Sequence, residues 1–308
     1  MIVVAGESLI DLLVGLDGVV EAAPGGGPYN TARTLGRLGR PVAFLGRLST
    51  DRFGALLRSG LAVEGVDLSL ALATDDPTLL AVAELDAAGG ATYRFYGEGT
   101  AAPGLLVSDV PDGLPPTAEA LHVGTLGLVF EPMAATIEAL VATASPDVLV
   151  MADPNCRPTA IRDASAYRAR LDRILGRVDV AKVSVDDLAW LDSGAGPLDA
   201  TRRILDRGPA AVLVTDGPRP VRLVTARGVV ELAVPAVPVV DTVGAGDAFG
   251  AGFLAAWTGA GRGRRDLADH EALASATQFA IEVGTRTTTR AGAEPPSLAE
   301  LEGVAGLW

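Results

Sequence analysis

Apolar segments alternate with segments of helical period along most of the chain. Short runs rich in Val, Leu and Ala are typical of strands that are buried on both faces. The segments between them carry apolar residues every three or four positions, which indicates helices packed on a sheet. This alternation predicts a mostly parallel sheet with right-handed crossovers, helices on both faces, and ligands at the carboxyl ends of the strands. The predicted strands are residues 2–5, 42–45, 120–123, 148–151, 180–183 and 211–215, and the predicted helices are residues 30–38, 132–143, 167–175 and 198–207.

One region departs from this alternation. Residues 78–96 contain two stretches of alternating polarity around Ala88, Gly89 and Gly90, which is the pattern of a hairpin. We expect segments at about 12–20 and 78–98 to form a small antiparallel sheet over the mouth of the main sheet. This sheet would act as a lid or as the surface of a homodimer. An ordinary edge hairpin is the alternative interpretation.

Composition narrows the class of protein. With 308 residues and 49% hydrophobic content, the chain can bury a large core, either as two domains or as one α/β unit. The formal net charge of -13 offers no basic surface for nucleic acid or an anionic membrane, so small-molecule partners are favoured. The single cysteine, Cys156, excludes an intramolecular disulfide, and the start of the chain does not resemble a signal peptide. We therefore expect a cytoplasmic location.

The most informative motif is the glycine-rich segment DTVGAGDAFGAG at residues 241–252. It follows residues 237–240, a β-branched run interrupted by a proline, so the order predicts a strand, a tight loop and a helix. The N–H groups of Gly244, Ala245 and Gly246 would lie at the helix start, where unpaired donors and the helix dipole favour an anion. Asp247 lies beside those donors and could accept the proton of an attacking hydroxyl. The motif therefore indicates phosphoryl transfer.

Other interpretations of the glycines are weaker. A dinucleotide-binding turn follows the first strand and has an acidic residue about 20 positions later, whereas this loop lies late in the chain. A phosphate loop of the G-x-x-x-x-G-K type is excluded because the only lysine, Lys182, is not in a glycine-rich segment. A helix start that only packs against a strand remains as the alternative without ligand.

A second group of polar residues lies near the amino end. Asp11 follows the first strand, and the glycine-rich residues 24–29 lead to Asn30 at the start of a helix. A carboxylate and an amide beside exposed backbone offer the paired hydrogen bonds that a polyhydroxylated ligand needs. We interpret them as a sugar clamp. Asn30 could also be the N-cap of the helix, and the two roles are compatible.

With both motifs in view, the chain resembles the ribokinase-like family of carbohydrate kinases, often called the PfkB family. The resemblance rests on GGxxxN at residues 25–30 and on DTVGAGDAFGAGFL at residues 241–254, and intermediate motifs such as Asp153-Pro154-Asn155 also match. It covers essentially the whole chain, and it implies a single ribokinase-like domain over residues 1–308, with a three-layer αβα core and a β-sheet lid.

The resemblance also implies an activity and a set of site residues. The activity is transfer of the γ-phosphate of ATP to a sugar hydroxyl, with Mg²⁺ and, in many members, K⁺. Asp247 would be the base, and Gly244, Ala245 and Gly246 would form the anion hole. The sugar would be held by Asp11, Gly26, Gly27 and Asn30, the nucleotide by Lys182, Ser184, Thr215 and Gly217, and the monovalent cation by Asp241, with Val243 and Gly292 as further candidates.

One motif departs from the family pattern. Many members carry Asn-x-x-Glu near the nucleotide and magnesium, whereas this chain has Ser184 and Asp187. We carry Asp187 over as a magnesium-shell residue, and a solvated acid at a helix start is the alternative.

The substrate is the least constrained feature. The aromatic run that contains Tyr93 and Phe95 resembles that of bacterial fructokinases and of 2-keto-3-deoxygluconate kinases, in which lid residues touch the sugar. An acid sugar would need a cation such as Arg157, because alternation in the strand points Arg94 away from Tyr93 and Phe95. A ketose such as fructose is the first choice and the keto-acid the second. A nucleoside kinase of the same family and a non-catalytic sugar or nucleotide sensor remain as alternatives.

Overall fold

The main sheet provides the frame on which the other elements pack. The computed structural model describes residues 1–85, 91–111 and 113–304. Within these residues the main sheet has nine strands, and its middle strands are apolar and buried. In spatial order they are β13 (Gly228–Leu232), β12 (Arg219–Thr225), β11 (Ala211–Asp216), β10 (Val180–Ser184), β9 (Leu149–Asp153), β8 (Ala120–Gly124), β1 (Ile2–Ala5), β4 (Val42–Ser49) and β5 (Ala71–Thr74).

The sheet is parallel from β5 to β11 and antiparallel only at the edge formed by β12 and β13. The parallel pairing puts the carboxyl ends of these strands on one edge, so polar residues that follow them in the sequence come together in space. The prediction of a mostly parallel sheet is therefore confirmed.

Two helical layers cover the sheet, because alternate strand residues point to opposite faces. Ile2 and Val4 pack with the helices on one face, and Val3 and Ala5 pack with those on the other. The first layer contains α1 (Gly27–Arg37), α2 (Arg52–Val63), α7 (Ala245–Gly259) and α8 (His270–Thr287), and the second contains α3 (Met133–Thr143), α4 (Ala164–Leu175), α5 (Val185–Leu191) and α6 (Pro197–Leu205). Short 3₁₀ helices are η1 (Ala102–Gly104), η2 (Val107–Asp109), η3 (Thr125–Leu128), η4 (Arg264–Asp266) and η5 (Ala299–Val304). The predicted three-layer arrangement is confirmed.

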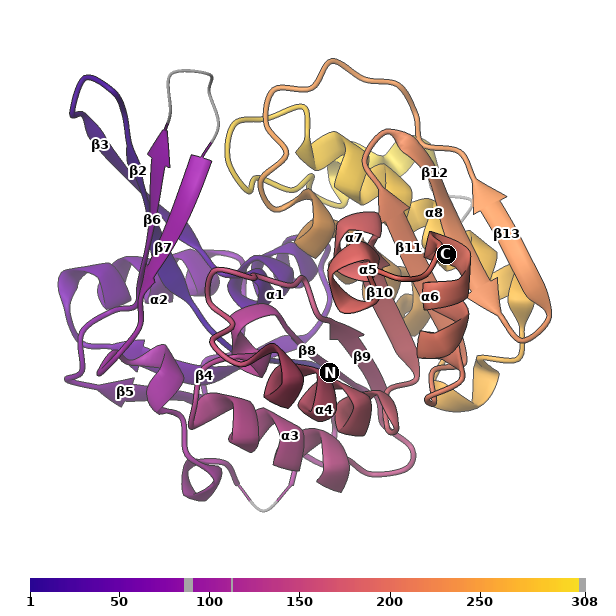
Figure 1. Cartoon of the computed structure of the whole chain (residues 1–308), viewed down its shortest axis with the longest axis horizontal. Helices are drawn as coiled ribbons and strands as arrows, with labels where there is room; N and C mark the ends of the chain where they lie inside the picture. Colours follow the sequence, from indigo (N-terminus) through magenta and orange to yellow (C-terminus); the bar gives the residue numbers. More distant parts are fainter. Residues whose placement is uncertain (86–90, 112, 305–308) are drawn as a thin grey trace.

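A separate four-stranded sheet forms the lid and projects from the body (Figure 1). Its strands, in spatial order, are β3 (Val20–Gly25), β2 (Leu9–Val14), β6 (Leu80–Leu85) and β7 (Ala91–Tyr96). The prediction of an antiparallel lid is wrong for one pair, since β2 and β6 run parallel. The reason is that both strands follow strands that are themselves parallel in the main sheet, so both leave it in the same direction. The predicted turn at Ala88, Gly89 and Gly90 lies outside the described residues, whereas the strands that flank it, β6 and β7, are described.

Most predicted elements have close counterparts, but two predictions need correction. Residues 237–240 form no strand: Val239 and Val240 are 62% and 63% exposed, and the segment has no partner strand. The helix predicted at residues 30–38 begins earlier, at Gly27, because Gly26 follows β3 as the N-cap residue and Pro28 fits the first helical turn. Within the described ranges, no helix combines the length and apolarity needed to cross a membrane.

Candidate active site

The glycine turn forms the amino end of α7, as predicted. Gly244 is the N-cap residue and has a φ of 74°, in the left-handed region that glycine adopts without strain. Ala245, Gly246 and Asp247 follow in the first helical turn, so the turn presents backbone N–H groups together with a carboxylate. The helix itself is buried from Asp247 to Thr258 and packs against α8 and α1. A buried helix holds this turn in a fixed position.

Asp247 is hydrogen-bonded to Asn30 on α1. The Asn30 side chain donates from Nδ2 to Asp247 Oδ2 at 2.9 Å, and both residues are buried. Burial raises the pKa of Asp247 to about 6, against the lowering effect of the Asn30 hydrogen bond. Asn30 Oδ1 is buried and has no hydrogen-bond partner in the described part of the chain. An unpaired buried acceptor beside a carboxylate of raised pKa suits a ligand that brings a hydroxyl donor.

The interpretation of Asn30 as a helix N-cap is wrong. Gly26 is the N-cap of α1, and Asn30 lies one turn inside the helix. The GGxxxN spacing therefore directs the Asn30 side chain to Asp247 and not to the backbone at its own helix start.

These residues open into a cavity of about 310 Å³ under the lid. Phe95 on β7 also borders a larger hollow of about 1010 Å³, which contains neither the glycine turn nor Asp247. The smaller cavity is therefore the candidate site, because it brings together nearly all residues predicted for the sugar and the reaction. Its lining includes Asp11, Gly26, Gly27, Asn30, Tyr93, Phe95, Arg157, Val243, Gly244, Gly246 and Asp247.

Asp11 and Arg157 place opposite charges in the same cavity. Burial raises the pKa of Asp11 to about 6, and the positive charge of Arg157 opposes this rise. Arg157 is held by Asn155, whose carbonyl and side-chain oxygens both accept from its Nη1. Tyr93 stacks on Phe95 at a centroid distance of 6.4 Å, and Arg94 pairs instead with the exposed Glu84. The predicted orientation of this strand is confirmed.

Glu7 is a site residue that the sequence alone did not assign. It is fully buried, and its two carboxylate oxygens accept from the backbone N–H groups of Gly27 (3.2 Å) and Gly127 (2.8 Å). The carboxylate thus ties the start of α1 to η3. Burial, with a smaller contribution from the charge of the nearby Asp247, raises the pKa of Glu7 to about 7, against the lowering effect of its backbone hydrogen bonds. Its two partners are backbone groups 20 and 120 residues away, so no local motif could have shown this role.

The residues predicted for the nucleotide lie at the carboxyl ends of β10 and β11. Ser184 and Thr215 are register partners on these neighbouring strands, and Gly217 follows with a φ of 56° in the turn to β12. Lys182 lies two residues before Ser184, on the same side of β10. Its ammonium is 2.6 Å from Asp153 Oδ2, and the pair is almost completely buried.

Asp187 has an internal partner for each of its oxygens. Oδ1 accepts from Cys156 N at 2.6 Å, while Oδ2 accepts from the backbone and hydroxyl of Ser184. The alternative of a solvated acid is wrong, because the side chain is only 4% exposed. Ser184 and Asp187 form a capping box at the start of α5, which fixes the loop that precedes the helix.

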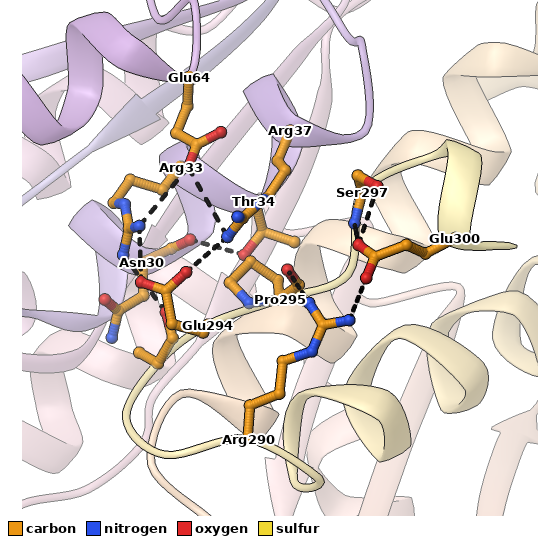
Figure 2. A network of polar contacts seen from close by, with 11 residues as sticks. Asn30, Arg33, Thr34, Arg37, Glu64, Arg290, Glu294, Pro295, Ser297 and Glu300 are labelled. Atoms are coloured by element: carbon orange, nitrogen blue, oxygen red, sulfur yellow. Dashed lines mark hydrogen bonds and ion pairs between the residues drawn. The ribbon is translucent and has the colours of Figure 1, made fainter.

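The predicted cation residues lie on two loops that touch. Asp241 accepts from Val243 N at 3.0 Å and from Gly292 N at 2.8 Å, so its carboxylate joins the loop before α7 to the loop after α8. The second loop is also bound to α1 (Figure 2): Glu294 pairs with Arg33 at 3.0 Å and with Arg37 at 2.6 Å. Glu64 approaches the same two arginines. The network therefore links the two loops predicted to bind the cation to the helix that carries Asn30.

Comparison with known proteins shows the family of this chain. The model of the pfkB family of carbohydrate kinases matches residues 2–300. A fructokinase from Rhizobium leguminosarum bv. trifolii is 38% identical over 260 residues, which are 83% of this chain and 79% of the relative.

Solved structures show the same likeness. A fructokinase from Xylella fastidiosa with bound ATP has a TM-score of 0.90 and 28% identity, over 99% of this chain and 98% of that one. A fructokinase double mutant from Vibrio cholerae O395, in its fructose-, ADP- and potassium-bound form, has a TM-score of 0.87 and 27% identity, over 98% and 97% of the two chains. With a family match along nearly its whole length, this chain belongs to the pfkB family of carbohydrate kinases.

Proposed function

We propose that the protein is an ATP-dependent fructokinase and that residues 1–308 form a single kinase domain. The observation that carries the proposal is the buried Asn30–Asp247 pair, which faces a cavity of sugar size at the amino end of α7. The fructokinase relatives support a ketose as the substrate. They do not favour the keto-acid, and Arg157 is already engaged by Asn155.

In the proposed reaction, a sugar hydroxyl lies between Asp247 and the glycine turn. Asp247 accepts the hydroxyl proton while the sugar oxygen bonds to the γ-phosphorus of ATP, and the bond to the β-phosphate oxygen breaks to release ADP. The N–H groups of Gly244, Ala245 and Gly246 stabilise the negative charge of the transferring group. A pure sensor would not need a carboxylate that repels phosphate at this position.

The remaining roles follow from the position of each residue. Asp11 and the unpaired oxygen of Asn30 accept hydrogen bonds from sugar hydroxyls, and Gly26 and Gly27 allow the sugar to approach the backbone. Tyr93, Phe95 and Arg157 complete the walls of the cavity. Ser184, Thr215 and Gly217 border the nucleotide at the ends of β10 and β11.

Two metal ions are part of the proposal. Mg²⁺ prefers phosphate oxygens, water and one or two carboxylates, and it would neutralise the phosphates of ATP. Because both Asp187 oxygens already accept from the chain, we propose that Asp187 acts on magnesium through bound water and does not ligate it directly. K⁺ fits the loops joined by Asp241, where Val243 and Gly292 lie beside the carboxylate. A cytoplasmic location stays a prediction.

A coupled ADP-release assay with ATP, Mg²⁺ and K⁺ tests the function. We expect turnover with fructose and much lower kcat/KM with 2-keto-3-deoxygluconate, ribose and adenosine. Preference for the keto-acid or for adenosine would overturn the substrate assignment. ATP binding without turnover on any sugar would favour the sensor.

Loss of the Glu294 charge is expected to weaken K⁺ activation. Glu294→Gln removes two ion pairs that hold the cation loop on α1, so the K⁺ concentration for half-maximal activity should rise roughly threefold to tenfold. Activity titrated with KCl at constant ionic strength measures this. Glu282→Gln is the control, since among the described residues Glu282 forms an ion pair only with Arg286 along α8. An unchanged K⁺ response in Glu294→Gln would show that the network does not support the cation site.

We also propose that two copies can pair through the lid. Leu16, in the turn between β2 and β3, is 74% exposed, and Tyr96 on β7 is 56% exposed. Val19 and Val20 are exposed near Leu16 in the sequence. Light scattering measures the molar mass in solution. We expect the mass of a dimer for wild type and of a monomer for the double variant Leu16→Asp/Val20→Asp. A monomeric wild type at micromolar concentration would refute the pairing.

A further inference from the structure

Lys182 is the only lysine in a chain with 25 basic residues, and it is buried. Lysine is seldom buried, because removing an ammonium from water costs more free energy than one ion pair usually returns. Here the cost is met in part by Asp153, whose Oδ2 accepts from Nζ at 2.6 Å. Burial alone would lower the pKa of Lys182, but the Asp153 carboxylate raises it, so the side chain keeps its charge.

The ammonium lies against the glycine turn. A methyl group placed on Gly246 would stand 3.0 Å from Lys182 Nζ, so the missing side chain of Gly246 is what lets the charge reach the turn. Gly250, one helical turn later, gives similar room to the Lys182 stem and to His122. The centre of the anion hole is therefore in contact with a cation from the sheet beneath it.

The local hydrogen bonds are not saturated. An ammonium has three donors, and within the described residues Asp153 is the only hydrogen-bond acceptor of Lys182. Asp153 Oδ1 is also buried and unpartnered. His122, on the other side of the lysine, is neutral because burial and the Lys182 charge lower its pKa to about 3. Lys182 thus supplies the positive charge on this side of the turn and has N–H donors that are not engaged by another described residue.

We infer that Lys182 is the charged member of the anion hole, donating to the phosphoryl group during transfer, and that Asp153 is the residue that positions it. The inference deepens the proposed kinase reaction and rests on it. Backbone N–H groups provide only partial charges, whereas a desolvated ammonium interacts strongly with the charge that develops on the transferring group.

Lys182→Met tests the charge at nearly constant volume. We expect kcat to fall roughly 10²-fold or more, a loss comparable to removal of an oxyanion-hole donor. The affinity for fructose without nucleotide, measured by calorimetry, should stay within about twofold of wild type because Lys182 does not line the sugar cavity. The affinity for the β,γ-imido analogue of ATP should fall. A kcat within about threefold of wild type would overturn the inference.

Chemical rescue separates the charge from packing. In Lys182→Ala, methylammonium should restore part of kcat, whereas methanol, which is similar in size and neutral, should not. Equal rescue by the two compounds would mean that Lys182 only fills space. Rescue also requires folded protein, so it remains informative if the variant is less stable.

Asp153→Asn tests the positioning role. The asparagine oxygen can still accept from Lys182, but the negative charge is lost. The groups that face the ammonium are then Asp187, Asp247 and the neutral His122. The pKa of Lys182 should fall, so activity should decline at a lower alkaline pH than in wild type. If activity declined at the same alkaline pH in Asp153→Asn as in wild type, the positioning role of Asp153 would be refuted.

Failure of the sugar kinase proposal can be distinguished from failure of the inference about Lys182. If wild type binds the ATP analogue but phosphorylates no sugar, the sugar kinase is wrong, and the analogue affinities of wild type and Lys182→Met still decide whether Lys182 contacts the phosphates.

Discussion

Asp247→Asn is expected to lower kcat for fructose phosphorylation roughly 10²-fold or more, while the protein still folds and binds the sugar. The asparagine side chain has the same shape and can accept from Asn30, so the link between α7 and α1 is kept. What is lost is the group that accepts the hydroxyl proton. Steady-state kinetics together with calorimetric sugar binding separates the two effects.

The pH dependence of the wild type provides a second measurement of the same base. Asp247 must be ionised to act, and burial raises its pKa to about 6, so kcat/KM for ATP should fall as the pH drops through about 6. Saturating sugar is needed, because Asp11 has a pKa of about 6 as well and would otherwise affect sugar binding in the same range. The residual activity of Asp247→Asn should lack this acid limb.

Asp179→Asn is the matched control. Asp179 is also a buried carboxylate, but it lies at the start of β10, on the opposite edge of the sheet, and binds Val150 N, Arg177 and Arg264. This variant should lose stability and keep its pH profile. If Asp247→Asn retained activity within about tenfold of wild type, another group would have to be the base.

The sequence predicted the parts of the fold that follow from local pattern. The buried strands read as continuous apolar runs, and the glycine turn with Asp247 was assigned to a helix start from spacing alone. The strand at residues 237–240 was a wrong prediction because β-branched residues favour a strand only when a partner is present, and Pro235 and Pro238 cannot donate to one. The antiparallel strands β12 and β13 were missed, although Asp216-Gly217, between β11 and β12, is a turn signal.

The contacts within the site were harder to predict from the sequence than the fold. Asn30 and Asp247 are 217 residues apart, and each motif indicated a function without indicating their contact. Glu7 and Asp153 act on backbone groups or on a buried lysine, so their roles depend on tertiary packing and not on spacing. Asp187 looked like a metal ligand because its type and position fit, and only the structure shows that its oxygens are already taken by the chain.

Gly244→Ala is expected to damage catalysis well beyond its effect on folding. A methyl group at this position would stand 2.5 Å from Ala293 Cβ and 3.0 Å from its Cα, so the cation loop or the glycine turn must shift. The substitution also forces alanine into a φ of 74°, which costs about 1–2 kcal/mol. Displacing one anion-hole donor lowers kcat roughly 10²-fold, and the displaced loop should weaken K⁺ activation in the same variant.

Gly261→Ala separates backbone strain from the geometry of the site. Gly261 follows the other end of α7 with a φ of 69°, and a methyl group there would meet nothing within 4 Å. Both variants should therefore lose a similar free energy of unfolding from strain, as urea titration would show. Only Gly244→Ala should also lose kcat and K⁺ activation. If the two variants had the same kinetics, contact between the glycine turn and the cation loop would not matter for the reaction, and the anion hole would have to depend on Ala245, Gly246 and the buried ammonium beneath them.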